Sequence, residues 1–241
     1  MRKANKQIFL IVNGDDFGAS AGVNRGVIEA LTNGILTSAS LMINMPGSAE
    51  AIELAHHYPA LSIGLHVNFT NEGDPVLDLN DTEAAKAELH RQYQLFVSCL
   101  GRPPTHIDSH HNIHRLENLT PLFLELAHET NLPLREHSPV TYFSSFYGQW
   151  DGASHPEHIS PEQLSFVLET EIKPGFTELA CHPGYVSSDF RSEYSVEREV
   201  ELRSLCHSTV RERVQELGIT LVNYAQAHNL LRPESPNGPA P

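Results

Sequence analysis

Cysteine, tryptophan and methionine are scarce in this sequence of 241 residues, which contains three, one and three of them. Cys99, Cys181 and Cys206 lie far apart, and none of them belongs to a CxxC pair of the kind found in thiolate zinc sites. An odd and scattered set of cysteines also argues against a disulfide framework and fits a reducing compartment. The sequence therefore predicts a cytoplasmic protein whose chemistry does not depend on cysteine.

Basic residues and long apolar runs are also in short supply. The chain has 16 Lys and Arg against 30 Asp and Glu, a formal net charge of −14, so it would repel the phosphates of a nucleic acid. No apolar run approaches the roughly 18 residues of a membrane helix, and the first residues lack the pattern of a signal peptide. We expect no nucleic-acid partner and no membrane span.

Histidine, by contrast, is abundant. The chain has 15 histidines, almost as many as its lysines and arginines together. Histidine is the commonest metal ligand in proteins and the usual acid or base near neutral pH. Histidines that cluster at strand ends would therefore indicate chemistry, whereas scattered ones would indicate a solvated surface.

Apolar segments of strand length alternate with segments of helical periodicity. The apolar run at 7–13, closed by Gly14, is typical of a central strand that is buried on both faces. Ser20, Asp81 and Ser160 each precede a helical pattern and are predicted N-caps. Such alternation predicts one α/β domain over residues 1–230, whose parallel sheet is either open or closed into a barrel. About seven parallel strands are expected, at residues 7–13, 35–45, 61–68, 105–109, 132–135, 177–182 and 219–223.

Two segments break this alternation. Residues 138–158 lack a clear periodicity and hold five aromatic residues between Tyr142 and Trp150, which we interpret as an excursion or lid. These aromatics could contact a substrate, but apolar surface outside a barrel more often marks association, which favours a homodimer. The last residues, 231–241, contain four prolines and are predicted to form a disordered tail.

Polar residues gather where the predicted strands end. Asp15 and Asp16 follow the first strand and His66 ends the third. His106, Asp108 and His110 lie at the end of the fourth, and His182 ends the sixth. Because the carboxyl ends of parallel strands meet at one rim, we expect these side chains to lie close together. One carboxylate can ligate a metal ion while its neighbour acts as the base for a water of lowered pKa, and a histidine can protonate the leaving group.

Each part of this pattern also has a plainer interpretation. An aspartate pair after a strand can cap the following helix, and His66 alone can be a hydrogen-bonded structural residue. The run from His106 to His114 is harder to explain by structure alone, because its nine residues hold four histidines and one aspartate. The coincidence of all these residues at one rim favours a functional site.

Five short motifs carry a family resemblance. Residues 11–18 (IVNGDDFG), 37–42 (TSASLM), 64–68 (GLHVN), 105–114 (THIDSHHNIH) and 182–185 (HPGY) resemble, in order and spacing, the YdjC-like carbohydrate deacetylases. The resemblance runs from about residue 7 to 224, and Tyr194, Arg198 and Glu201 are similar to that family's last helical segment. It implies a distorted (β/α) barrel and the metal-dependent removal of acetyl groups from N-acetylated sugars such as chitooligosaccharides, which are small-molecule substrates.

The resemblance also implies roles for individual residues. Asp16, His66 and His110 are similar to the family's metal ligands, with Asp15 as general base and His182 as general acid. Two imidazoles favour a transition metal, whereas the family resemblance keeps magnesium open, so the cofactor is one divalent ion, Mg²⁺ or Zn²⁺, with Mn²⁺ and Co²⁺ as alternatives.

Two further residues and two departures concern the surroundings of that site. His114 and Arg135 follow the fourth and fifth strands and are expected to bind substrate, to support the ligands, or to form surface ion pairs. Gly14 stands where the family usually has Ala, a change we expect to be harmless. Asn112 stands where the family often has His, which could alter substrate contacts without affecting the three ligands.

Two other functions use the same residues. A phosphoesterase of a histidine-rich barrel type would need several metal ions and a basic residue for phosphate, and its first strand would be expected to end in His-x-His. A non-catalytic protein that binds a metal or a sugar would keep Asp16, His66 and His110 but would not need Asp15 as a base.

Overall fold

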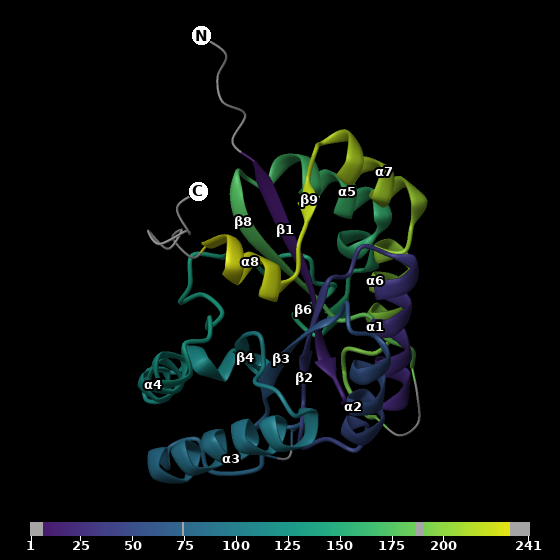
Figure 1. The fold of residues 1–241 in the computed structure, drawn as a ribbon. Helices are drawn as coiled ribbons and strands as arrows, with labels where there is room; N and C mark the ends of the chain where they lie inside the picture. The colour runs from purple at the N-terminus through teal and green to yellow at the C-terminus, as the bar shows by residue number, and fades with distance from the viewer. Residues whose placement is uncertain (1–6, 74, 187–189, 232–241) are drawn as a thin grey trace, which may run out of the picture.

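A parallel sheet with β1 near its centre organises the computed structural model, which describes residues 7–73, 75–186 and 190–231 (Figure 1). The strand order is β4-β3-β2-β1-β8-β5, and β9 pairs with the beginning of β1. The strands are β1 (Ile8–Phe17), β2 (Ser38–Leu41), β3 (Ser62–Val67), β4 (Ile107–Ser109), β5 (Thr141–Phe143), β8 (Gly175–Cys181) and β9 (Thr220–Leu221). A short antiparallel hairpin, β6 (Gln149–Trp150) and β7 (Ala153–Ser154), stands apart from this sheet.

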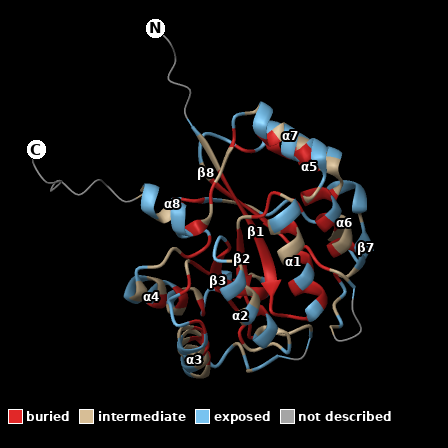
Figure 2. Ribbon diagram, turned by 45° about the vertical axis from the view of Figure 1, so that its right-hand side comes forward, coloured by how far each residue is buried: buried red, intermediate tan, exposed pale blue. Residues whose placement is uncertain are grey.

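The helices form an outer layer in which neighbours contact one another in the order α7, α5, α6, α1, α2, α3, α4. Figure 2 shows that these helices are buried on one side and exposed on the other, while the strands are buried throughout most of their length. Ser20, Asp81 and Ser160 each accept a hydrogen bond from the backbone N–H three residues on, so the three predicted caps are confirmed. The helices are α1 (Ala21–Asn33), α2 (Ser48–His57), α3 (Thr82–Leu100), α4 (Thr120–Thr130), α5 (Pro161–Thr170), α6 (Val196–Leu205), α7 (Ser208–Glu216) and α8 (Tyr224–Leu231), with 3₁₀ turns at His110–Arg115 and Pro156–Ile159.

The end of β1 is irregular, and this irregularity shapes the rim. The register of β1 against β2 shifts between Gly14 and Phe17, as in a β-bulge. Asp16 within this bulge has φ of 65°, a left-handed conformation that is uncommon for a residue other than glycine. Two adjacent aspartates thereby project in different directions from one strand end.

The prediction of a strand at residues 132–135 is wrong. Residues 132–135 form only an isolated bridge between Leu134 and Ile107, because the chain turns away at Glu136, where φ is 65°. The missing strand is supplied by β5, which lies inside the segment that we interpreted as an excursion and pairs with β8. Only part of that segment leaves the barrel, because Phe146 is buried whereas Tyr147 and Trp150 are exposed.

The predicted single α/β domain with a parallel sheet is confirmed. The sheet curls into a half-barrel whose edge strands are β4 and β5, and this arrangement agrees with the distorted (β/α) barrel that the resemblance implies. Tyr224 of α8 stacks on His106, next to β4, and donates a hydrogen bond to Glu178 of β8, so this helix covers the side that the sheet leaves open. The proposed tail, 231–241, lies outside the described residues except for Leu231.

Candidate active site

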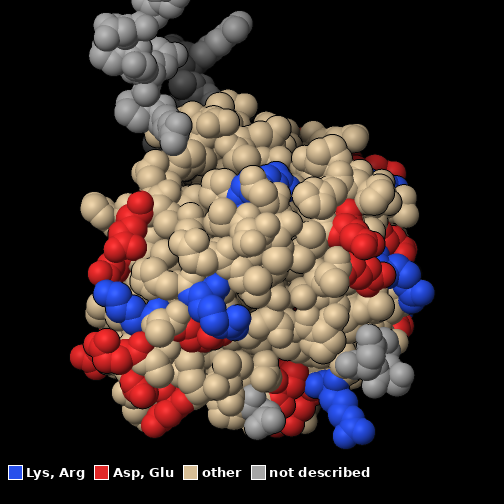
Figure 3. All heavy atoms as spheres, turned by 60° about the horizontal axis from the view of Figure 1, so that its bottom comes forward, with Lys and Arg blue, Asp and Glu red and all other residues tan. Residues whose placement is uncertain are grey.

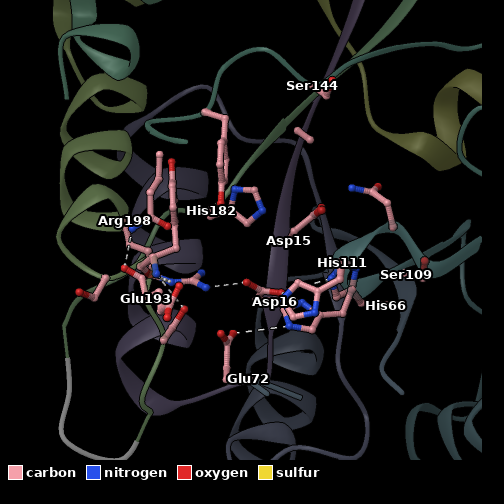
Figure 4. A pocket seen from close by; sticks show the side chains of 18 of the residues that line it. Asp15, Asp16, His66, Glu72, Ser109, His111, Ser144, His182, Glu193 and Arg198 are labelled. Carbon is pink, nitrogen blue, oxygen red and sulfur yellow. Dashed lines mark hydrogen bonds and ion pairs between the residues drawn. The ribbon is translucent and has the colours of Figure 1, made fainter. Parts of the chain in front are cut away.

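A cavity of about 990 Å³ opens at the carboxyl ends of the strands (Figure 4). Asp15, Asp16, His66, His110 and His182 all line it, so the structure brings together the five residues that the sequence places at strand ends. On this face of the molecule, charged side chains of both signs lie mostly around the edge (Figure 3).

Among the described residues, no helix is long and apolar enough to cross a membrane.

Asp16 and two histidines form a compact group of ligand atoms. The Oδ1 atom of Asp16 lies 3.2 Å from Nε2 of His66 and 3.0 Å from Nδ1 of His110. All three side chains are buried, and their ligand atoms are close enough for one ion to contact all of them. The other oxygen of Asp16, Oδ2, accepts a hydrogen bond of 2.7 Å from Arg198 of α6. Oδ1 of Asp16 therefore faces the two histidines, and Oδ2 is fixed by Arg198.

A carboxylate also stands on the far side of each imidazole. Nδ1 of His66 lies 2.8 Å from Oδ1 of Asp108, and Nε2 of His110 lies 3.5 Å from Oε1 of Glu72. Proteins orient metal-binding histidines in this way, because a hydrogen bond to one ring nitrogen fixes the tautomer and leaves the other nitrogen free to bind. The arrangement prepares Nε2 of His66 to act as a ligand.

Asp15 pairs with a buried arginine, although its carboxylate also lies within 4.8 Å of a ring nitrogen of His66. The guanidinium of Arg135 donates two hydrogen bonds of 2.8 Å to Asp15, and the side-chain amide of Asn13 donates a third of 2.8 Å. Burial alone would raise the pKa of Asp15, but Arg135 outweighs it and lowers the pKa. Asp15 therefore carries a charge at any pH near neutrality, in an orientation fixed by its partners.

The buried charges around the site do not balance. Among the described residues, the carboxylates of Asp15, Asp16, Asp108 and Glu178 pair with two buried guanidiniums, those of Arg135 and Arg198. Burial opposes a charge on His66, but Asp108 and the other carboxylates raise its pKa to about 10, which shows how strongly the site favours positive charge. A carboxylate oxygen and two imidazole nitrogens in an acidic pocket form a donor set that fits a divalent cation.

His182 lies across the cavity from the aspartates, directly after β8. Its side chain is 22% exposed, and its ring makes T-shaped contacts with the rings of Tyr147 and Tyr194. Its backbone N–H donates a hydrogen bond of 2.5 Å to Glu201 of α6. The ring therefore reaches the cavity from a well-anchored loop.

His114 and Arg135 do not lie on the wall of the cavity. His114 is completely buried and contacts Ser109 and Glu136. Arg135 is 1% exposed and pairs with Asp15, Asp108 and Glu178. Of the expected roles, support of other site residues agrees with these positions, whereas direct contact with substrate and a surface ion pair do not.

The plainer interpretation of the aspartate pair does not agree with the structure. Ser20, not Asp15 or Asp16, caps α1. Asn112, where the family often has His, lies on the cavity wall beside His111, and both residues adopt left-handed conformations, with φ of 52° and 53°. Such strain in two successive non-glycine residues is characteristic of functional sites. At Gly14, an added Cβ would lie 2.8 Å from a methyl group of Leu36, which a small side-chain shift could relieve.

Sequence reasoning assigned no role to several charged residues that build the site. These are Glu72, Asp108, Glu178, Arg198 and Glu201. The sequence did contain an indication for Glu178. It lies among the apolar residues of a predicted strand, and a carboxylate buried there needs a buried partner. Another was present in α6, whose pattern is poorly amphipathic because it buries two glutamates and an arginine.

Comparisons with known proteins agree on one family. The model of the YdjC-like protein family matches residues 9–216. The carbohydrate deacetylase of Geobacillus stearothermophilus is 34% identical over 92% of this chain and 99% of its own, and the chitooligosaccharide deacetylase of Yersinia enterocolitica is 32% identical over 90% and 98%. A solved structure from Enterococcus faecalis V583, described as a candidate cellobiose-phosphate cleavage protein, superposes with a TM-score of 0.77 at 30% identity, covering 91% of this chain and 98% of that one.

Proposed function

The chain belongs to the YdjC-like protein family, and from this premise we propose that it is a metal-dependent deacetylase of N-acetylated sugars. The enzyme class, a carbohydrate deacetylase that hydrolyses an amide bond, follows from relatives that align with almost the whole chain. The observation that supports metal dependence is the group formed by Asp16, His66 and His110, whose ligand atoms converge in a pocket with excess negative charge.

We assign Asp16, His66 and His110 as the residues that hold the cation. A divalent ion at this position would lower the pKa of water and polarise the acetyl carbonyl. Mg²⁺ and Zn²⁺ are the proposed ions, with Mn²⁺ and Co²⁺ as alternatives, because the donor set is compatible with each of them.

The proton transfers fall to residues of the chain on either side of the cavity. Asp15 is proposed to accept the proton of the attacking water at a carboxylate oxygen, and Arg135 and Asn13 hold that carboxylate in place. His182 is proposed to donate a proton to the nitrogen of the departing amino sugar. The products would be acetate and a free amino group on the sugar.

The substrate is proposed to be a chitooligosaccharide or a related acetylated glycan. The named relatives act on such carbohydrates, and a cavity of about 990 Å³ lies at the upper end of the range for small-molecule sites. Tyr147 and Tyr142 on its wall offer ring surfaces that a sugar could contact.

Acetate release from diacetylchitobiose by metal-stripped protein tests this proposal. Resupply of Zn²⁺, Mg²⁺, Mn²⁺ or Co²⁺ should restore release, and Asp16→Ala should abolish it because one of three ligands is lost. Release that persists in the stripped protein would contradict metal dependence. Absence of release from every N-acetylated sugar tested, with metal bound, would contradict the deacetylase proposal.

A further inference from the structure

Glu201 of α6 is a completely buried carboxylate next to His182. Burying an unpaired carboxylate is costly, so its partners indicate why it is there. It accepts hydrogen bonds from the backbone N–H of His182 and from the hydroxyl of Tyr194. Arg198, on the same helix, directs its guanidinium to Asp16 instead. The two hydrogen-bond donors of Glu201 are thus a backbone N–H and a hydroxyl, and neither is a cationic side chain.

The neighbour with an unmet need is the ring of His182. Its Nδ1 atom is buried without a hydrogen-bond partner and lies 3.7 Å from Oε1 of Glu201, just beyond hydrogen-bond distance. A small rotation of the ring would make this bond. Because the backbone N–H of His182 already donates to the same carboxylate, this rotation would let Glu201 bind both the backbone and the ring of His182. Nε2 is then the nitrogen that remains for the cavity.

We propose that Glu201 is the positioning residue for His182. Its carboxylate accepts the Nδ1 proton, directs Nε2 toward the substrate, and stabilises the protonated ring that a proton donor requires. The hydroxyl of Tyr194 keeps Glu201 in place, and the stack of Tyr194 on Tyr147, with centroids 4.5 Å apart, limits the tilt of the His182 ring. This inference rests on the proposed function for its catalytic meaning, although the pairing itself can be measured without turnover.

The groups that face His182 determine the direction of a pH effect. They are Glu201 from α6 and the stacked rings of Tyr147 and Tyr194 from two loops. Burial and the nearby Glu201 raise the pKa of both tyrosines, so their hydroxyls stay neutral near pH 7. Glu201 is therefore the group whose removal should make His182 easier to deprotonate.

The test compares Glu201→Gln with Glu197→Gln, a matched change one helical turn away. Glu197 is also buried, but its carboxylate accepts from the backbone N–H of Ser195 rather than from His182. In Glu201→Gln, kcat should fall about 10- to 100-fold with little change in KM. The alkaline limb of the pH profile of kcat should move to lower pH by about one pH unit. Glu197→Gln should keep the parental pH profile.

Two further measurements distinguish a failure of this inference from a failure of the proposed function or of the variant to fold. ¹⁵N NMR of His182 should show a lower pKa in Glu201→Gln, and this holds even if no sugar substrate is deacetylated. Tyr194→Phe removes a hydrogen-bond donor from Glu201. It should therefore shift the alkaline limb of the kcat profile and the pKa of His182 upward. This variant tests the inference if Glu201→Gln does not fold. An unchanged His182 pKa in the folded Glu201→Gln protein, or in Tyr194→Phe where that is the variant available, would overturn the inference.

Discussion

His106 shows how a single buried side chain can make stability depend on pH. The ring is completely buried between Tyr224, on which it stacks at 3.7 Å, and the hydroxyls of Ser40 and Thr105. Its close fit extends to Gly64, where an added Cβ would lie 2.3 Å from the ring. Burial lowers the pKa of His106 to about 4, although Asp108 opposes this effect. His106 is therefore neutral in the folded protein at pH 7.

We expect this histidine to destabilise the protein as the pH falls. The unfolded chain binds the proton near pH 6.5 and the folded chain only near pH 4, so stability is complete above 6.5 and is lost between 6.5 and 4. The loss should be on the order of 3 kcal/mol in the free energy of unfolding. Burial also lowers the pKa of His111 and His114, so the quantity to measure is the difference between the parent and His106→Asn in urea unfolding across this range. Equal slopes for both proteins would contradict the prediction.

At the same scale, the sequence was informative about which residues meet but not about what holds them. Asp15, Asp16, His66, His110 and His182 could be placed together because they follow strands of one parallel sheet. The partners Glu178, Arg198 and Glu201 come from β8 and α6, and their pairing depends on side-chain directions that periodicity does not specify. The bulge at Asp16 likewise was not among the features predicted from the sequence.

At the scale of elements, the close contact between α1 and the loop after β8 sets the position of His182. A Cβ at Gly26 would lie 2.5 Å from the Cα of Gly184, so only glycine allows the helix to approach this closely. We predict that Gly26→Ala destabilises the protein by about 1–3 kcal/mol, since backbone must move on one side. The same displacement should lower kcat, because Gly184 is two residues from His182.

Thr32→Ala is the control for this change, because Thr32 is exposed on the same helix. Thermal unfolding and acetate release of the two variants give the comparison. A Gly26→Ala protein with parental stability and activity would show that the contact between Gly26 and Gly184 is not important.

The strands that could be predicted were those with long apolar runs. The central strand was correct, since the run at 7–13 matches the first part of β1. Residues 132–135 look like a strand but make one bridge, whereas β5 is three residues long and not fully buried, so neither has a local pattern that identifies it. The packing of α8 across the open side could not be predicted either, because it depends on the contacts of Tyr224 with His106, next to β4, and with Glu178 of β8.

For the whole molecule, association of two chains remains a prediction. Tyr147 and Trp150 are exposed beside the cavity, and Trp150 stacks on His155 at 3.8 Å in the β6–β7 region. Sedimentation equilibrium should give twice the mass of the chain, and Trp150→Ser should shift the protein toward the monomer. A parent protein with the mass of one chain at high micromolar concentration would contradict the homodimer.

In the proposed mechanism, two adjacent aspartates have separate roles. Asp16 faces the histidines and Asp15 faces Arg135, so the loss of one should remove the cation and the loss of the other should remove only the chemistry. The most direct measurement is acetate release from diacetylchitobiose by Asp15→Asn protein in which calorimetry has shown bound metal. We predict parental metal affinity and a fall in kcat of about 10²- to 10⁴-fold. Undiminished turnover with metal bound would contradict the account, because Asp15 would then have no part in the reaction.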